Sequence, residues 1–403
     1  MLDIEVLTPT RTDSLYEFRC NLNPHPSLGD RSRRRGPQGA SLRSSELRFG
    51  FRVRNFTIAH HEVWDSFYPL FFLTRNGGPL FDRGFDRAHI RFHYPIPAIV
   101  RDFFTRRAAD FGVTITVEAD TTEARLDQPT SGNVLAFGGG KDSRLLLGLL
   151  RELGSDPVVI TAKGANALDI GEALVTESLH GALVDRIMPS YMALGRRLYF
   201  GATIGDVHLE TPWQQHYDVS SPGPIAQMSG LLAALGVEME ILTPATVLPY
   251  NIIQRILHDR YPDLYRYQVS TRPGSRSEKS LHIALIKMVN GHSFEGQCSV
   301  EVFGQMLEKF VRRQTAEPAD HGYRNRRLIV QREMRAIIWR LRDGPIFAAV
   351  RDRIPDDWDA SWIDYIHPYV LPSLDPEYLA IYRDYAVSVE DVDPATTIWR
   401  IPI

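Results

Sequence analysis

Residues 133–153, NVLAFGGGKDSRLLLGLLREL, decide the fold of this chain. A short apolar segment typical of a buried strand precedes three glycines and Lys-Asp-Ser, and an amphipathic helix then runs to Gly154. Because glycine lacks a Cβ, residues 138–140 allow a sharp turn that brings backbone N–H groups against an anion. The helix N-terminus, expected after Ser143, adds unpaired amides and the positive end of the helix dipole. The stretch therefore predicts a phosphate-binding loop.

Spacing excludes two common glycine-rich loops. A Walker loop requires glycine five residues before the Gly-Lys pair and Ser or Thr directly after the lysine, but Leu135 and Asp142 stand there. A dinucleotide-binding fingerprint that starts at Gly138 requires glycine or alanine at its sixth position, which is Ser143. Neither loop fits this sequence.

The loop resembles the SGGxDS signature of the PP-loop ATP pyrophosphatases, which split ATP between its α and β phosphates and adenylate a substrate oxygen. The Gly-Gly-x-Asp-Ser core is intact at residues 139–143, and Gly138, which follows Phe137, stands in place of the first serine. The resemblance implies ATP and Mg²⁺ as cofactors. It assigns phosphate binding to the backbone of residues 137–141 and to the Ser143 hydroxyl, a point charge to Lys141, and the magnesium hydration shell to Asp142.

Further ATP-binding and catalytic residues are implied on the segments that follow later strands. Thr161 and Lys163 follow the second strand, where relatives meet adenine or ribose. Gly201, Ala202 and Asp206 are similar to the Gly-Ala-x-x-x-Asp element of the 7-cyano-7-deazaguanine synthase branch, which makes Asp206 a second candidate for magnesium. We expect the polar loop after Asp206 to recognise substrate; its candidate residues are His208, His216 and Asp218.

A basic loop stands where those relatives carry zinc-binding cysteines. Arg272, Arg276 and Lys279 are suited to an anionic substrate or to the departing pyrophosphate, although a solvated charge run is an equal alternative. Only Cys20 and Cys298 are present, so neither a disulfide framework nor a structural zinc site is expected.

The form FGGGKDS after a long preceding region is most similar to the UDP-N-acetylmuramoyl-L-alanyl-L-glutamate epimerase group. Those enzymes adenylate an α-carboxylate, epimerise the adjacent carbon and hydrolyse the adenylate. An epimerase needs an acid and a base on opposite faces of that carbon. The sequence does not choose among the candidates, which are His208, His216, Asp218, His282, His292 and Cys298.

Two other functions remain open at this point. A PP-loop ligase would let ammonia, an amine or sulfur attack the adenylate and form an amide, a nitrile or a thiocarbonyl. A nucleotide-binding sensor would bind ATP or AMP without chemistry. Leu2 excludes an N-terminal cysteine amidotransferase signature, and the Asp142-Ser143 pair favours catalysis over sensing.

Composition limits the partners. The chain has 403 residues, 43% of them hydrophobic, and a net charge of −3, which disfavours non-specific nucleic-acid binding. No signal peptide and no long apolar run is evident, so we expect a cytoplasmic protein without membrane partners. A small-molecule carboxylate is the expected substrate, and a homodimer is possible.

Alternating strands and helices predict an α/β fold of the doubly wound, PP-loop and Rossmann-like type. We expect an N-terminal α+β domain over 1–128, an ATP-binding domain over 129–270 and a mainly helical region over 271–403. In the ATP-binding domain the expected strands are 134–137, 158–161, 183–188, 198–200 and 237–242. The expected helices are 143–153, 167–179, 224–235 and 249–260.

Overall fold

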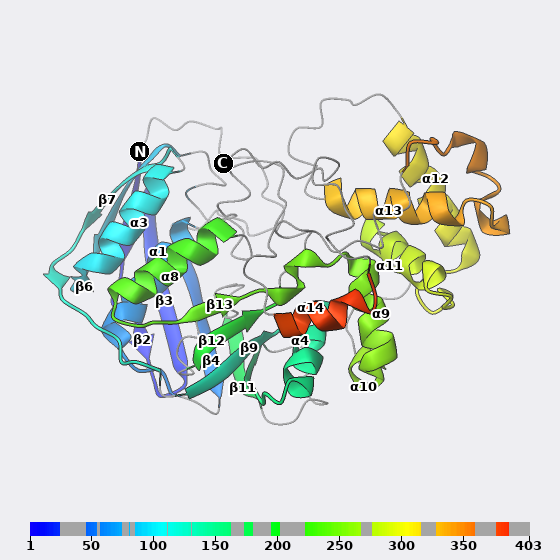
Figure 1. The fold of residues 1–403 in the computed structure, drawn as a ribbon. Helices are drawn as coiled ribbons and strands as arrows, with labels where there is room; N and C mark the ends of the chain where they lie inside the picture. The colour runs from blue at the N-terminus through cyan, green and yellow to red at the C-terminus, as the bar shows by residue number, and fades with distance from the viewer. Residues whose placement is uncertain are drawn as a thin grey trace. The chain divides into compact units, whose positions relative to one another are not determined.

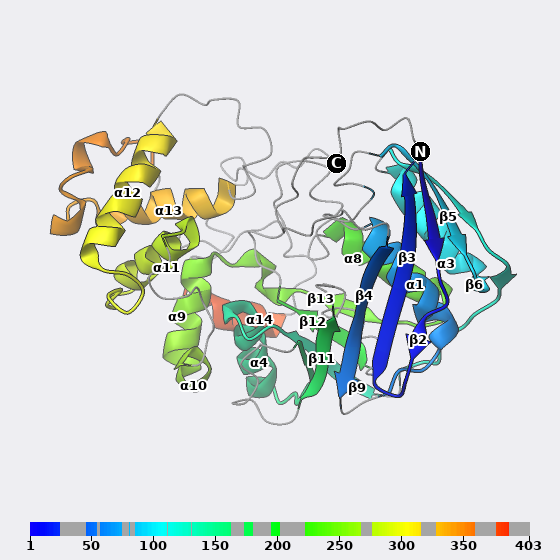
Figure 2. The ribbon, with the colours of Figure 1, turned by 180° about the vertical axis from the view of Figure 1, so that it is seen from behind.

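The computed structural model describes residues 1–24, 46–54, 57–74, 80, 85–110, 112–129, 131–162, 173–179, 195–201, 222–266, 276–315, 328–358 and 376–386. The chain forms two compact units (Figures 1 and 2). The sheet unit comprises Met1–Gly138, Asp156–Tyr199 and His216–Leu242, and the helical unit comprises Gly139–Ser155, Phe200–Gln215 and Thr243–Ile403. The expected three-domain division stays a prediction.

One mixed sheet of 11 strands forms the sheet unit. Its strands, in spatial order, are β13 (Glu240–Leu242), β12 (Gly195–Phe200), β9 (Ser131–Phe137), β10 (Val158–Ala162), β11 (Leu174–Leu179), β4 (Glu46–Arg54), β3 (Leu15–Pro24), β1 (Leu2–Val6), β5 (Arg87–Phe92) and β7 (Thr114–Glu118). In addition, β2 (Thr10–Arg11) pairs with β3, while β6 (Ile96–Pro97) and β8 (Thr121–Thr122) form a separate pair. The coarse α/β prediction is confirmed.

Five neighbouring strands of this sheet have the order of a doubly wound fold. Numbered along the chain from β9, they run 3-2-1-4-5 from β11 to β13. Strands β9, β10 and β11 are parallel, and so are β12 and β13. The order reverses between β9 and β12, and doubly wound sheets bind ligands beyond the carboxyl ends of the strands at such a point. The segments that follow β9 and β12 are therefore the first places to search for a site.

The N-terminal strands extend the same sheet. Strand β4 pairs antiparallel with β11 on one side and with β3 on the other, and β1 then joins β3 to β5. In residues 47–54, apolar Leu47, Phe49, Phe51 and Val53 alternate mostly with arginines, the pattern of a half-buried strand, and β4 has this conformation. Aromatic side chains on one side of these strands pack together, since the rings of Phe18 in β3 and Phe49 in β4 stack at 5.3 Å. Phe18 also contacts Tyr68, which belongs to the helix at His61–Thr74.

Three helices cover one face of the N-terminal strands. They are α1 (His61–Thr74), α3 (Ala98–Asp110) and α8 (Pro222–Ala234). Figure 1 shows these helices in front of β1, β3 and β4, and the view from behind in Figure 2 shows the strands in front. Aromatic side chains join the helices, since the rings of Phe67 in α1 and Phe104 in α3 lie 5.1 Å apart.

The helical unit contains α4 (Lys141–Glu152), α9 (Tyr250–Arg260), α10 (Pro262–Arg266), α11 (Glu278–Val289), α12 (Val300–Thr315), α13 (Leu328–Leu341) and α14 (Pro376–Arg383). Short 3-10 turns lie at η2 (Pro244–Val247), η3 (Pro345–Phe347) and η4 (Arg351–Arg353). Helices α11, α12 and α13 share an apolar core that includes Leu285, Phe303 and Ile337. None of the helices in the described part of the chain is both long and apolar enough to cross a membrane.

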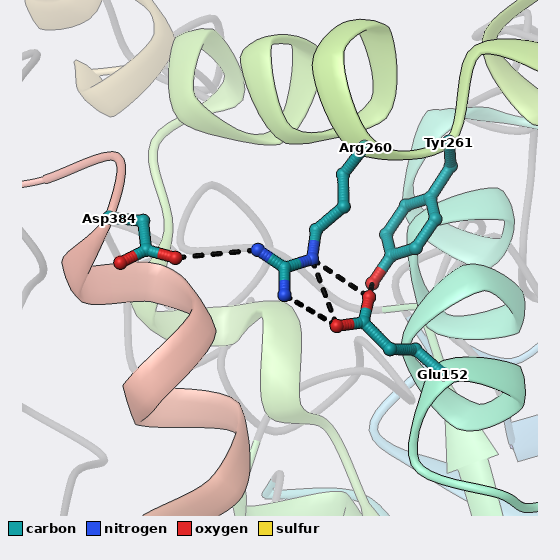
Figure 3. Close-up of polar contacts among 4 residues, drawn as sticks. All are labelled: Glu152, Arg260, Tyr261 and Asp384. Carbon is teal, nitrogen blue, oxygen red and sulfur yellow. Dashed lines mark hydrogen bonds and ion pairs between the residues drawn. The ribbon is translucent and has the colours of Figure 1, made fainter.

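The far end of α4 is anchored to α9 and α14 (Figure 3). Arg260 donates two hydrogen bonds from Nε and one from its terminal nitrogen to the Glu152 carboxylate, at 2.5–3.0 Å, and Tyr261 donates a fourth at 2.6 Å. Arg260 also pairs with Asp384 at 3.3 Å. The bonds from Arg260, above all, lower the pKa of Glu152. The ring of Tyr261 lies so close to Gly148 that an added Cβ would be 2.6 Å away, which fixes how α4 packs.

Two predicted elements differ from the structure. The helix expected at 143–153 begins two residues earlier, at Lys141, so Ser143 is its third residue. The helix expected over 167–179 is wrong for its last six residues, which form β11. Pairing with β10 and β4 on both edges, together with β-branched Val175 and Thr176, outweighs the helical pattern there. The strand expected at 183–188 lies outside the described residues.

Candidate phosphate-binding site

The glycine loop turns from β9 into α4 with an open surface. Gly139 has φ +72°, a left-handed conformation that glycine adopts without strain. Gly140 is the N-cap of α4 in an extended conformation, and no side-chain hydrogen bond caps the helix from that position. Among the described residues, a Cβ added to Gly138 or Gly140 would meet nothing within 4 Å. The loop thus leaves room beside its backbone.

The first turn of α4 presents backbone donors. Lys141, Asp142 and Ser143 open the helix, and the first amide bonded within it is that of Arg144, which donates to Gly140 O at 3.1 Å. The amides at a helix N-terminus lack partners within the helix and favour negative charge. This end of α4 therefore has the chemistry of an anion-binding site.

Two side chains of α4 fix the shape of the loop. The Arg144 side chain is fully buried and donates from Nε to Gly139 O at 3.0 Å. Ser143 Oγ donates to Gly140 O at 3.2 Å. Both bonds use loop carbonyl oxygens and leave the amides at the helix end to other partners. The sequence interpretation missed Arg144; its only signal was an arginine directly before the apolar run of residues 145–147.

Gly201, directly after β12, lies against the start of α4. A Cβ built on Gly201 would be 3.0 Å from Ser143 N and 3.2 Å from Asp142 Cβ. A side chain at this position would therefore cover the Ser143 amide. The end of β12 meets the loop after β9, as a reversal of strand order between the two strands requires.

Lys141 and Asp142 form a close pair beside an aromatic ring. Lys141 Nζ lies 2.6 Å from Asp142 Oδ1 and 3.7 Å from the centre of the Tyr250 ring. The ring attracts the ammonium group through its electron-rich face, and the carboxylate attracts it by charge. Tyr250 thus orients the lysine that we expect to meet a phosphate, and no sequence pattern indicated this role for Tyr250.

A buried polar network continues from Tyr250 into the helical unit. The Tyr250 ring meets the His282 ring edge-on at 5.2 Å, and His282 Nε2 lies 2.7 Å from Glu333 Oε2. The other Glu333 oxygen accepts a hydrogen bond from the Asn251 amide at 2.6 Å. Glu333 is 1% exposed, so these bonds are what makes a carboxylate tolerable there. His282 is therefore a structural neighbour of the loop through Tyr250.

The other described candidates occupy different surroundings. Thr161 is buried and lies opposite Phe137 in the β10–β9 pair. Arg276 and Lys279 are exposed at the start of α11, where Ser277 accepts the capping bond from Ser280 N. Cys298 packs in the apolar helical core, and burial raises the pKa of its thiol, which is the environment of a structural rather than a reactive cysteine.

Seven candidate residues lie outside the described part of the chain. They are Lys163, Ala202, Asp206, His208, His216, Asp218 and Arg272. Within the described part no group of three or more His, Cys, Asp or Glu side chains could bind a metal ion. Magnesium binding by Asp142 and Asp206 therefore stays a prediction.

Comparison of the chain with protein-family models, with curated proteins and with solved structures finds no match in any of the three.

Proposed function

We propose that the chain is an ATP-dependent enzyme that adenylates a carboxylate and releases pyrophosphate. The observation that supports this most directly is the lack of room for a side chain at Gly201, where an added Cβ would lie 3.0 Å from Ser143 N and 3.2 Å from Asp142 Cβ. This close approach joins the ends of β9 and β12 at the reversal of strand order, where doubly wound sheets bind nucleotides. A turn with no ligand would not need Gly201 to keep the Ser143 amide uncovered.

The described residues fit a polyphosphate. The α4 amides supply several N–H donors in one small region, and the space beside Gly138 and Gly140 is open. Lys141 adds a positive charge that Tyr250 orients. Donors and a cation at one helix end suit the several oxygens of a triphosphate.

The reaction follows from the resemblance of residues 139–143 to the PP-loop signature. A substrate carboxylate oxygen attacks the α-phosphorus of ATP, the bond from that phosphorus to the α–β bridging oxygen breaks, and pyrophosphate leaves with the bonding electrons. Backbone amides and Lys141 stabilise the negative charge that grows on the departing group. In the adenylate the carboxylate charge is neutralised, so the adjacent C–H bond becomes more acidic.

We propose epimerisation of a glutamyl or peptide-like substrate as the next step, with ligation as the alternative. Two groups must then face opposite sides of the α-carbon. His282 is bonded to Glu333 in the network behind Tyr250, whereas the centres of the His258 and His292 rings lie 4.1 Å apart and leave no room for a carbon between them. Incubation in deuterated water should place one deuterium at the α-carbon of the product. New nitrogen or sulfur in the product would indicate a ligase instead.

The test of adenylation is pyrophosphate release from ATP across a set of carboxylates. Gly201→Ala adds a methyl group 3.0 Å from a backbone nitrogen that cannot move freely. We expect a loss of at least about tenfold in turnover, because one oxyanion-binding amide is hindered. The matched control is Gly304→Ala, whose added methyl group meets open space in α12. ATP binding without pyrophosphate release from any carboxylate would favour a sensor, and equal activity of both variants would refute the site.

A further inference from the structure

A separate pocket of about 630 Å³ lies within the helical unit. One wall is a face of α9, where Asn251, Arg255, His258 and Asp259 fall within about 100° of arc and span about 12 Å of the helix. Val289 at the end of α11, His292 in the segment that follows it and Arg340 of α13 help to form the remaining wall. Figure 1 shows the three helices. The volume suits a small molecule.

The pocket is rich in nitrogen donors. Among the described lining residues, Arg255 and Arg340 contribute two guanidinium groups and Asp259 one carboxylate. Arg255 also donates from Nη1 to the backbone oxygen of Tyr385 at 3.2 Å, and a guanidinium group has five N–H donors in all. The carboxylate already has a partner, since Asp259 Oδ1 lies 2.7 Å from His258 Nδ1. The positive charge of the lining therefore exceeds the negative charge even when both histidines are neutral. Guanidinium groups bind carboxylate and phosphate oxygens through paired hydrogen bonds.

The two histidines add imidazole nitrogens to the pocket. The rings of His258 and His292 lie 4.1 Å apart with a tilt of 39°. With Nδ1 of His258 bonded to Asp259, its Nε2 remains for a ligand. Two imidazoles so close resist being protonated together, and an oxyanion beside them removes that penalty.

We propose that this pocket is a second binding site, which takes a small molecule bearing several carboxylate or phosphate groups. The site is separate from the glycine loop: its anion partners are side chains of α9, of α13 and of the segment that follows α11, whereas the loop uses the backbone of α4. Asn251 follows Tyr250, whose ring contacts Lys141, so the two sites share the first turn of α9.

Calorimetric titration of the full chain tests the proposal with citrate, L-glutamate, pyrophosphate and inorganic phosphate as probes. At least one probe should bind. Arg340→Gln should weaken that binding about tenfold or more, because a charged hydrogen bond is lost. The exposed Arg312→Gln in α12 is the matched control and should leave it unchanged. Tighter binding of the carboxylates or of the phosphates identifies the source of the anion.

Two further measurements distinguish binding in the pocket from binding at the glycine loop and from loss of binding through misfolding. Gly201→Ala should retain citrate binding, because Gly201 belongs to the other site. In NMR spectra of the unaltered chain, citrate should shift the ring signals of His258 and His292 but not those of His89, which pairs with Asp3 and Glu118. The proposal is overturned if no probe binds, if Arg312→Gln weakens binding as much as Arg340→Gln, or if Gly201→Ala alone removes it.

Discussion

The glycine loop and the α9 pocket are both suited to anions, but they are built from different atoms. At the loop, backbone amides of α4 face an open space, and glycines keep side chains away. In the pocket, charged and imidazole side chains from α9, from α13 and from the segment after α11 line the space. A site made of backbone should be sensitive to added atoms, whereas a site made of side chains should be sensitive to their removal.

The two sites also share support. Glu333 accepts a hydrogen bond from the backbone N–H of Asn251, and Asn251 lines the pocket. Through His282 it also lies behind Tyr250, which contacts Lys141 at the loop. A change to this carboxylate should therefore affect both sites, while changes within each site should affect that site alone.

The largest expected effect comes from Glu333→Ala. Removing one partner of a buried ionic network should lower the free energy of unfolding by about 3 kcal/mol. Urea denaturation measures this change, and the exposed Glu301→Ala in α12 is a control expected to stay within about 0.5 kcal/mol of the original chain. A loss in only one of the two binding activities at full stability would show that the sites do not share Glu333.

A smaller effect is expected from Lys141→Met, which removes the charge at the loop and retains an unbranched side chain of similar length. ATP affinity should fall about tenfold, because one charged contact to phosphate is worth about 1.5 kcal/mol or more. Citrate affinity should not change. Arg340→Gln should show the reverse pattern, with weaker citrate binding and unchanged ATP binding. Weaker binding of both ligands in either variant would show that the two sites are not distinct.

The Tyr250 ring should contribute less than the lysine that it orients. Tyr250→Phe keeps the ring over Lys141 Nζ and should leave ATP affinity nearly unchanged. Tyr250→Leu removes the cation–π contact and should weaken ATP binding by roughly 0.5–1 kcal/mol. Equal losses in the two variants would mean that the hydroxyl, and not the ring, is important.

The smallest effect concerns pH at the pocket. Burial and the nearby His258 lower the pKa of His292 below its ordinary value of 6.5. At pH values between this lowered pKa and 6.5, the unfolded chain binds more protons than the folded chain. The free energy of unfolding should therefore fall as the pH falls through this window. Denaturation at pH 7.5 and 5.5 should show a smaller difference in His292→Gln, and citrate should reduce the difference in the unaltered chain. A difference that citrate enlarges would contradict an anion site.

The turn from strand to helix was predictable because its signal lies in consecutive residues, and the anion at this turn stays a prediction. Three glycines and Lys-Asp-Ser between a strand and a helix indicate both the turn and the anion. Tyr250, Glu333 and Arg340 gave no such signal, because the helices that carry them meet only through tertiary packing. The strand β11 was missed for the same reason, because its conformation depends on pairing with β4, which is distant in the sequence.

The junction of β11 with β4 determines where the chain cannot be divided. Five residues of β11, from Val175 to Leu179, are in register with residues 54 to 50 of β4, and Glu177 pairs with Arg54. Expression of the segment from residue 129 onward would remove β4 and expose a row of unsatisfied N–H and C=O groups along β11. Such an edge pairs readily with another chain, so this shortened protein should self-associate instead of behaving as an independent nucleotide-binding domain.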